Sequence, residues 1–586
     1  MPTSTPDSLP SDSLTNLTRI NNARFEALEH NLDVFFLLIM SVIIFSMQCG
    51  FAFLEAGSVR SKNTTNILIK NILDPCLAAV AYWLCGWAFA YGSPSHAFIG
   101  YGGFAGSTVD ATEFHLWFFQ FVFAATASTI VSGAVAERCD FAPYVIYCTF
   151  ITGFLYPVIT HWAWADDGWL KNVGGQTGFI DFAGSGVVHL CGGICALFGA
   201  AFLGPRIGRF KTTQYDKIDI KGHSVPLASL GGFLLMFGFF AFNGGSQGHI
   251  SHPGDGEAIA RAMLNTILSG ALGALTTLVI GKICHHQWRL LSTLNGALAG
   301  MVAICAGCNA FESWSAVCTG IVAGAVYVLC ALVVRRLKID DPLEAVAVHA
   351  GGGLWGLLSS PIFDRNHGIV FYFNRQSFLY FGWNLIGAIS IILWSAFWCL
   401  IIFGSLRLLN ILRVPEEVEI KGLDIMKHGE PAYPLISYGH GWGEPWNLTN
   451  SFTQRLKSEP KQTLSRPHTI ARCLYEHPEL EWISRSNPSD LENPSANDQN
   501  QNEPRRPSQT SVSLPRAIIY PQHPGAVNYD SGLRTISHPR FRPLNANNMI
   551  HPAPMGGNAG YAWGDPSEPV GPNIPSGTVY SIYRTS

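Results

Sequence analysis

The chain has 586 residues and a formal net charge of −3, and only 13% of its residues are charged. An average soluble domain carries about 25% charged residues, so a large soluble enzyme of this length would lack the charged surface it needs. The composition also argues against a nucleic-acid-binding protein, because there is no basic excess and no basic stripe. With 48% hydrophobic residues, the chain is typical of a membrane protein.

Eleven apolar runs follow one another along the chain, each long enough to cross a bilayer as a helix of about 20 residues. They predict an all-α polytopic membrane protein with eleven transmembrane helices. The eighth and tenth runs are the weakest by length. The runs are 32–58, 66–91, 113–136, 141–162, 181–203, 225–244, 257–284, 290–308, 312–334, 343–361 and 379–405.

Positive charges are distributed unevenly between the segments that join these runs. If the N-terminus lies outside the cell, the cytoplasmic segments and span ends carry 16 Lys and Arg residues and the outer ones carry 6. Cytoplasmic loops are enriched in Lys and Arg, so we predict an extracellular N-terminus and, with an odd number of spans, a cytoplasmic C-terminus. Asn16 then lies in an outward-facing glycosylation sequon, whereas the sequons at Asn63 and Asn447 face inward.

The two ends of the chain differ from the apolar region. The first 30 residues are polar and contain no signal-peptide core. Residues 414–586 hold 22 of the 34 prolines, a composition that cannot bury enough apolar surface to fold. We therefore divide the chain into an extracellular N-terminal segment (1–31), an eleven-span domain (32–413), a cytoplasmic segment (414–435) and a disordered cytoplasmic tail (436–586).

The fifth and tenth spans carry similar glycine-rich sequences around a histidine. Residues 187–193 read VVHLCGG and residues 347–352 read AVHAGG. Such glycines let helices approach closely in a bilayer, so we expect these spans to pack together. They also predict two repeats of five spans, and because five is odd the second repeat is inverted. Inverted repeats with a binding site at their interface are typical of transporters.

The histidines of these two segments, His189 and His349, lie in the middle of their spans. A polar side chain there is costly and suggests a functional residue. We expect both rings to be neutral because burial disfavours the imidazolium ion, so each offers one hydrogen-bond donor and one acceptor. Two alternatives stay open: structural histidines bonded to backbone carbonyls, and a pair that binds metal.

Other features argue against a metal or cofactor. No third ligand recurs in the two spans, and His249, His252 and the pair His285-His286 lie in loops. We therefore predict no metal site and no cofactor.

Two residues near the outer ends of spans could act on a cation. Asp181 opens the fifth span, where aspartate commonly caps a helix. It lies eight residues before His189, so it could also stabilise a cation on the same face; the two roles are compatible. Trp164 ends the fourth span beside Asp166 and Asp167, an acidic stretch that favours a cation at the mouth.

Five longer motifs follow one another along the chain: 57–63 (GSVRSKN), 132–138 (SGAVAER), 181–189 (DFAGSGVVH), 242–246 (FNGGS) and 340–344 (DDPLE). In their sequence and order they resemble the ammonium transporter (Amt/Mep/Rh) superfamily, and most closely its Amt type. The resemblance covers residues 32–433.

The resemblance implies a homotrimer in the plasma membrane in which each protomer has its own pore. Trp164, Ser246 and Phe123 correspond to an external ammonium site, and Asp181 to the acid beside it. Phe123 and Phe242 correspond to a stacked outer gate.

The resemblance further implies a transport mechanism in which ammonium is bound, loses its proton, and crosses as ammonia past His189 and His349. The substrate is then ammonium or ammonia, with methylammonium as an analogue, taken up for nitrogen utilization. The surroundings are lipid, and neither nucleic acid nor an enzymatic reaction is involved.

The C-terminal segment 421–429 (KGLDIMKHG) resembles the regulatory segment of the family. Met426 stands where plant relatives have a phosphorylatable Thr, so phosphorylation at this position is not expected.

Two rival functions remain: an ammonium sensor that signals through the tail, and an Rh-type gas channel, against which Trp164 argues. A membrane enzyme is a more distant alternative, because no nucleophile and base occur together.

Overall fold

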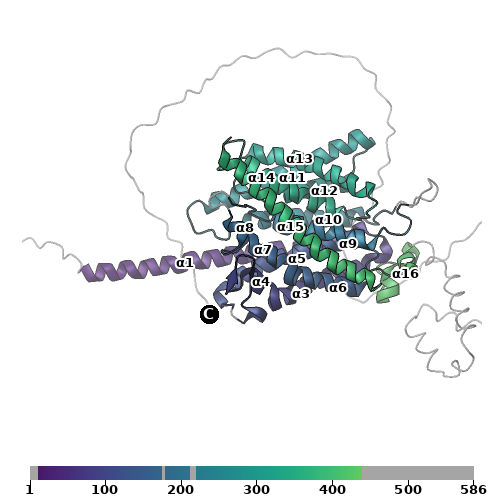
Figure 1. The fold of residues 1–586 in the computed structure, drawn as a ribbon, viewed down its shortest axis with the longest axis horizontal. Coiled ribbons are helices and arrows are strands. Elements are labelled where there is room, and N and C mark those ends of the chain that lie inside the picture. Colours follow the sequence, from purple (N-terminus) through teal and green to yellow (C-terminus); the bar gives the residue numbers. More distant parts are fainter. Residues whose placement is uncertain (1–10, 108, 174–177, 211–219, 439–586) are drawn as a thin grey trace, which may run out of the picture. The chain divides into compact units, whose positions relative to one another are not determined.

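The structure is a computed structural model that describes residues 11–107, 109–173, 178–210 and 220–438. These residues belong to one compact unit, Met1–Pro478. They are almost entirely helical (Figure 1), apart from a short antiparallel pair, β1 (Ser95–His96) and β2 (Ile99–Gly100). The predicted tail beyond residue 438, Asn447, and the second unit, Glu479–Ser586, lie outside the described residues.

Eleven apolar helical segments occur in the described part of the chain. Ten are long enough to cross a membrane, and Leu290–Ile304 is shorter, with 15 residues. Each predicted run overlaps one of these segments, so the prediction of an eleven-helix membrane protein is confirmed. The ten long segments are Thr15–Ser58, Ser61–Tyr91, Ala111–Val135, Phe141–Asn172, Ser185–Leu203, Val225–Gly245, Asp255–His285, Ser313–Arg336, Val346–Phe363 and Arg375–Leu408.

Several spans consist of more than one helix. The first is divided at Ser46, whose hydroxyl donates to the Ile43 carbonyl at 2.6 Å, and π-helical turns interrupt or begin others. The spans are built from α1 (Ser11–Phe45), α2 (Met47–Ser58), α3 (Thr64–Ala81), α4 (Trp87–Tyr91), α5 (Phe114–Val135), α6 (Phe141–Phe150), α7 (Tyr156–Trp164), α8 (Trp169–Asn172), α9 (Cys191–Leu203), α10 (Val225–Gly245), α11 (Asp255–His285), α12 (Leu290–Ile304), α13 (Ser313–Arg336), α14 (Gly352–Phe363) and α15 (Arg375–Leu408).

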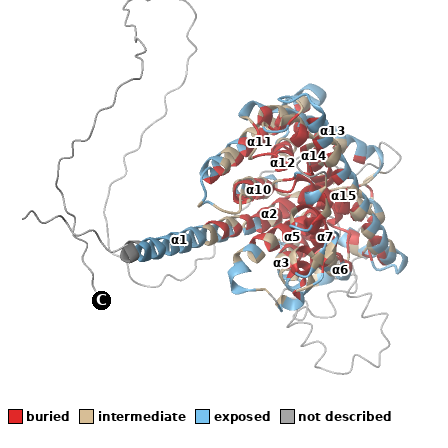
Figure 2. Ribbon diagram, turned by 60° about the vertical axis from the view of Figure 1, so that its left-hand side comes forward, coloured by how far each residue is buried: buried red, intermediate tan, exposed pale blue. Residues whose placement is uncertain are grey.

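The first helix begins well before the first apolar run. We predicted that the span starts at residue 32, but α1 starts at Ser11, and residues 15–32, including Asn16, are exposed (Figure 2). The physical reason is that apolar composition marks only the part of a helix that is removed from water by lipid or by protein. The helix itself continues through residues of good helix propensity, such as Ala, Arg and Glu.

The buried residues lie in the middle of the bundle and the exposed ones on its periphery (Figure 2). The exposed residues include many large apolar ones. Phe233 and Phe237 on α10, Leu329 on α13 and Leu393 on α15 are each more than half exposed. A soluble protein rarely exposes such side chains on several neighbouring helices. A bilayer covers them, as expected for a multi-pass membrane protein.

The fifth and tenth spans pack against each other, as the glycine pattern predicts. A Cβ atom on Gly193 would lie 2.2 Å from the Ala350 nitrogen, and one on Gly353 would lie 2.4 Å from the Ser185 oxygen. Position 193 thus faces 350, whereas position 185 faces 353. Residue numbers rise along one span as they fall along the other, so the spans run antiparallel, the relation expected of inverted repeats.

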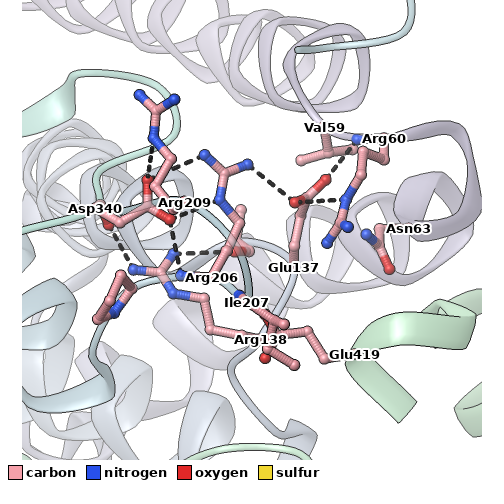
Figure 3. Close-up of polar contacts among 12 residues, drawn as sticks. Val59, Arg60, Asn63, Glu137, Arg138, Arg206, Ile207, Arg209, Asp340 and Glu419 are labelled. Atoms are coloured by element: carbon pink, nitrogen blue, oxygen red, sulfur yellow. Dashed lines mark hydrogen bonds and ion pairs between the residues drawn. The ribbon is translucent and has the colours of Figure 1, made fainter. Parts of the chain in front are cut away.

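Loops at one end of the bundle meet in a buried ion-pair cluster (Figure 3). Arg206 Nη1 lies 2.9 Å from Glu137 Oε2, and its Nε lies 2.7 Å from Asp340 Oδ2. Arg60 contacts Glu137 at 3.0 Å, and Arg209 contacts Asp340 at 3.3 Å. We call these five residues the charged cluster. It connects the ends of the first, third, fifth and ninth spans, all in segments predicted to be cytoplasmic.

The chain after the last span lies against one of these loops and against the first turn of α3. Glu419 of α16 (Glu416–Lys421) accepts a hydrogen bond from the Ile207 nitrogen at 2.7 Å. Asp424 accepts one from the Asn66 nitrogen at 2.9 Å. The segment 414–438 is therefore attached to the bundle by specific contacts, and Met426 lies partly exposed within it.

Candidate functional site

Three aromatic rings from three spans meet at the end of the bundle opposite the charged cluster. Phe123 of α5 and Phe242 of α10 stack with a centroid distance of 4.0 Å and an interplanar angle of 20°. Trp164, at the end of α7, contacts Phe123 edge-on at 5.9 Å. Phe123 and Phe242 are almost fully buried, whereas Trp164 is partly exposed. Phe123 therefore contacts both the partly exposed indole and the buried Phe242 ring.

The two histidines continue this series of rings. The His189 ring lies 5.4 Å from Phe242, and the His349 ring lies 5.2 Å from His189 at an angle of 22°. Beyond them, the Phe51 ring lies 6.5 Å from His349. We call the series Trp164, Phe123, Phe242, His189, His349 the ring column. It joins all the predicted gate and pore residues in one continuous series of ring contacts.

The histidines interact directly with each other. Their Nδ1 atoms are 3.2 Å apart, so one nitrogen donates and the other accepts when both rings are neutral. His189 Nε2 is buried and has no hydrogen-bond partner among the described residues. An unpaired buried polar atom is costly, and here it offers a hydrogen-bonding position beside Phe242 to a small polar molecule.

Each histidine lies near the start of its helical segment, not in the middle as predicted, on a π-helical turn that an aspartate caps. The turns are η7 (Ser185–Leu190) and η8 (Val346–Gly351). Asp181 accepts from the nitrogens of Gly184 at 3.1 Å, Gly186 at 2.8 Å and Val187 at 2.9 Å. Its carboxylate therefore satisfies backbone donors that a helix start leaves unpaired. The fifth span accordingly begins at Ser185 rather than at the predicted residue 181.

The second repeat has the same cap, which our reading of the sequence did not single out. Asp341 Oδ2 accepts from the Val346 nitrogen at 2.8 Å, while the neighbouring Asp340 belongs to the charged cluster. Asp181 precedes His189, and Asp341 precedes His349, by eight residues. This common spacing is the signal that separates Asp341 from the other acids of its segment.

Trp164 and Ser246 each donate a hydrogen bond to a backbone carbonyl near the Phe123–Phe242 pair. Trp164 Nε1 donates to the Asp181 carbonyl at 2.8 Å, which fixes the indole at the start of the fifth span. Ser246 ends α10, one turn after Phe242, and its hydroxyl donates to the Phe242 carbonyl at 2.8 Å. Because this donor is used, the hydroxyl oxygen keeps its lone pairs for an incoming donor.

A small cavity lies at the far end of the column, next to His349. It is lined by apolar side chains such as Phe51 and Leu298, and by the polar residues Glu55 and Asn295. Glu55 Oε2 accepts hydrogen bonds from Asn71 and from the Ser132 hydroxyl, the latter at 2.7 Å. The sequence analysis did not single out this acid. Its place in 53–58 (FLEAGS), at the end of the first span, is the feature that could have drawn attention to it.

Comparison with known proteins agrees with this architecture. The family model described as Ammonium Transporter Family matches residues 34–433. A Caenorhabditis elegans protein named putative ammonium transporter 1 is 50% identical over 490 residues, which cover 79% of this chain and 89% of that protein. Ammonium transporter 1 member 2 of Arabidopsis thaliana is 39% identical, over 70% of this chain and 84% of its own.

Solved structures show the same fold. One titled Sensor Amt Protein has a TM-score of 0.63 and 33% sequence identity, and the match covers 69% of this chain and all of that one. Mep2 of Candida albicans has a TM-score of 0.60 and 25% identity, over 66% of this chain and 87% of its own. With its eleven apolar helices and a family match across all of them, the chain belongs to the ammonium transporter family and is a transport protein rather than an enzyme.

Proposed function

We propose that the protein binds ammonium at Trp164, Ser246, Phe123 and Asp181, removes a proton, and conducts ammonia past His189 and His349. The observation that carries this proposal is the ring column, a continuous series of rings from a partly exposed indole to two buried imidazoles. Along the column, the π face of Trp164 is followed by the apolar pair Phe123 and Phe242 and then by the two imidazoles. This order suits binding of a cation followed by passage of a neutral molecule.

Recruitment at the outer end must distinguish ammonium from potassium, an ion of similar size and charge. The Trp164 ring offers a π face, which attracts a desolvated cation by up to about 2 kcal/mol. Ser246 adds a hydroxyl oxygen that can accept a hydrogen bond, and only ammonium can donate one. The Asp181 carboxylate is engaged with backbone donors, so its proposed contribution is a fixed negative charge behind the site.

Passage through the gate favours the neutral form. The stacked phenyl rings offer no polar group, and an ion moved into such surroundings without compensation is strongly disfavoured. An ammonium group like that of lysine has a pKa of about 10, so neutral ammonia is scarce outside the pore. The site must therefore take up the abundant ion and release its proton. Beyond the gate, His189 Nε2 offers ammonia a hydrogen-bond partner.

The arrangement in the cell is part of the same proposal. The excess of Lys and Arg at the charged-cluster end favours a cytoplasmic position for that end. Trp164 and Ser246 then face outward, residues 1–31 are extracellular, the spans comprise 32–413, and residues 414–435 and 436–586 are cytoplasmic. We further propose a homotrimer in the plasma membrane, with one ring column in each protomer, and glycosylation at Asn16.

Replacing Trp164 with leucine is expected to weaken recruitment of ammonium. Loss of about 1–2 kcal/mol of binding raises the half-saturating concentration roughly five- to thirtyfold. Maximal flux need not fall, because weaker binding also speeds release into the pore. The measurement is isotopic methylammonium uptake, with current recorded in the same cells, across a range of concentrations. Saturable uptake by the wild type tests the proposed function itself.

Trp83→Leu is the matched control for this experiment. Trp83 is about half exposed and lies outside the ring column, so its loss should leave the concentration dependence unchanged. Unchanged concentration dependence and unchanged potassium exclusion in Trp164→Leu would remove Trp164 from the proposed site.

The rival function, an ammonium sensor that signals through its tail, is testable by truncation. A chain ending at His440 keeps the contacts of Glu419 and Asp424 with the loops, so we expect methylammonium uptake within a few-fold of the full chain. A chain ending at Val414 loses those contacts, and a larger decrease is expected. Complete loss of uptake by the chain ending at His440, with normal surface expression, would contradict the prediction.

A further inference from the structure

Outside the ring column, three side chains between α10 and α11 bring nitrogen and oxygen atoms together. His249 Nδ1 lies 2.6 Å from Asp255 Oδ2. His252 Nδ1 lies 3.5 Å from the same oxygen and 3.3 Å from His249 Nδ1. The three atoms form a small triangle, with one carboxylate oxygen and two imidazole nitrogens at its corners.

This triangle has nearly the dimensions of one face of a tetrahedral metal site. Zinc binds imidazole nitrogen and carboxylate oxygen at about 2.0–2.2 Å in tetrahedral geometry, which places neighbouring donor atoms roughly 3.3–3.5 Å apart. Two edges of the triangle already match. The third, between His249 and Asp255, is a hydrogen bond that a metal would replace, and it must open by less than about 1 Å.

The surrounding chain holds the donors in place. Asp33 of α1 accepts from the nitrogens of Ile250 at 2.7 Å and Ser251 at 3.0 Å, which fixes the connector between the two histidines. Gln247 Nε2 donates to Asp255 Oδ1 at 3.0 Å and so orients the carboxylate. Such outer contacts are what position metal ligands in known sites.

The exposure of the three side chains suits a site that opens to solvent. The Asp255 side chain is 6% exposed, whereas those of His249 and His252 are 42% and 64% exposed. A buried carboxylate thus lies below two histidines that solvent reaches. An ion can enter from the solvent side, and water can complete its coordination.

We propose that His249, His252 and Asp255 bind a divalent transition metal of the zinc type, in the connector that follows Ser246. Two imidazoles and one carboxylate suit Zn²⁺, and equally Ni²⁺ or Cu²⁺, better than Mg²⁺ or Ca²⁺, which prefer oxygen ligands. A bound ion would link the connector between α10 and α11 to the first turn of α11. Asp33 already attaches the same connector to α1. We predicted no metal site because no third ligand recurs in the fifth and tenth spans and because His249 and His252 lie in a loop. In the structure the turn before α11 brings Asp255 to these two histidines.

The test is Zn²⁺ binding by the purified full-length protein, freed of any affinity tag, in competition with a chromophoric chelator. We expect the wild type to bind one Zn²⁺ per chain. His249→Ala and His252→Ala should each lower the affinity for Zn²⁺ by at least about tenfold. Both histidines are partly exposed, so these variants leave no buried gap, and their elution in gel filtration should match the wild type. Mg²⁺ should not compete.

The double variant His285→Ala/His286→Ala is the matched control, because these exposed histidines lie at the other end of α11. It should bind Zn²⁺ as the wild type does. X-ray absorption of the zinc complex should show nitrogen or oxygen ligands at about 2.0 Å, including two imidazoles. Absence of binding, or binding that survives loss of both His249 and His252, would overturn the proposal.

Discussion

Replacing His189 with glutamate is expected to let potassium ions enter the pore and to lower the selectivity for methylammonium over potassium at least about tenfold, or 1.4 kcal/mol. A carboxylate at this position would stand directly behind Phe242, where the wild type has a neutral ring at 5.4 Å. At about 4 Å, a unit negative charge stabilises a cation by roughly 4 kcal/mol at an effective dielectric constant of 20. The barrier that the apolar gate presents to ions would therefore fall.

His349→Leu should act differently. It removes the partner of the 3.2 Å contact between the two Nδ1 atoms without adding charge. We expect a lower rate of methylammonium uptake and an intact exclusion of potassium. Uptake and potassium current in the same cells measure both variants, so rate and selectivity are separated.

Phe239→Leu is the matched control for packing. Its buried ring lies 5.5 Å from His189, so the substitution disturbs the same region without changing a polar group. It should leave the selectivity unchanged. If both histidine variants fail to fold while Phe239→Leu folds, the histidines have a structural role and the proposed pore function is wrong.

Glu137→Gln is expected to destabilise the folded protein by about 3–5 kcal/mol, because it removes one partner of a buried ion pair. Glu137 is fully buried and contacts Arg206 at 2.9 Å and Arg60 at 3.0 Å. Without its charge, Arg60 and Arg206 lose the anion that they share, and Arg206 keeps only Asp340. The midpoint of thermal unfolding in detergent measures the loss. Glutamine has the same shape, so the effect reports charge rather than packing.

The pH dependence of this effect follows from two carboxylates of the charged cluster. Burial by itself would raise the pKa of Glu137, but the charges of Arg206 and Arg60 outweigh it and lower the pKa to about 2. Burial by itself would also raise the pKa of Asp340, but the hydrogen bonds and the charge of Arg206 outweigh it and lower this pKa to about 2. A lowered folded-state pKa means that the stabilisation is complete above the ordinary pKa of about 4.5 and is lost as the pH falls toward 2. The difference between wild type and Glu137→Gln should thus be constant from pH 7 to 5 and shrink below pH 4.5.

Lys171→Ala is the control for a surface ion pair in the same protein. Lys171 contacts Asp166 at 2.8 Å, but the Asp166 side chain is 99% exposed. Exposed pairs contribute about 0–1 kcal/mol, so the melting midpoint should hardly move. An equal effect of Lys171→Ala and Glu137→Gln would contradict the assignment of a structural role to the charged cluster.

Part of the candidate site could be predicted from local patterns. The two histidines were found because similar glycine-rich segments surround them, and the close approach of Gly193 to Ala350 shows why those glycines are needed. Trp164 was also found from its place at a span end beside Asp166 and Asp167, whereas the roles of Ser246, Phe123 and Phe242 came from resemblance to a family. Their stacking order cannot be derived from the sequence, because the rings come from α5, α7 and α10, which are far apart along the chain.

The sequence by itself determined the class of protein and the number of spans. Both depend on how many consecutive apolar residues a bilayer requires, which is a property of local composition. Only the tertiary structure decided which of the acids Asp340, Asp341 and Glu344 caps the tenth span and which joins the charged cluster. It also decided that α1 extends to Ser11 and that Asp255 meets His249 and His252, two local features that apolar runs do not mark. The separate roles of the acids and the order of the rings depend on contacts between distant segments, and a contact of that kind leaves no periodic pattern in the residues that make it.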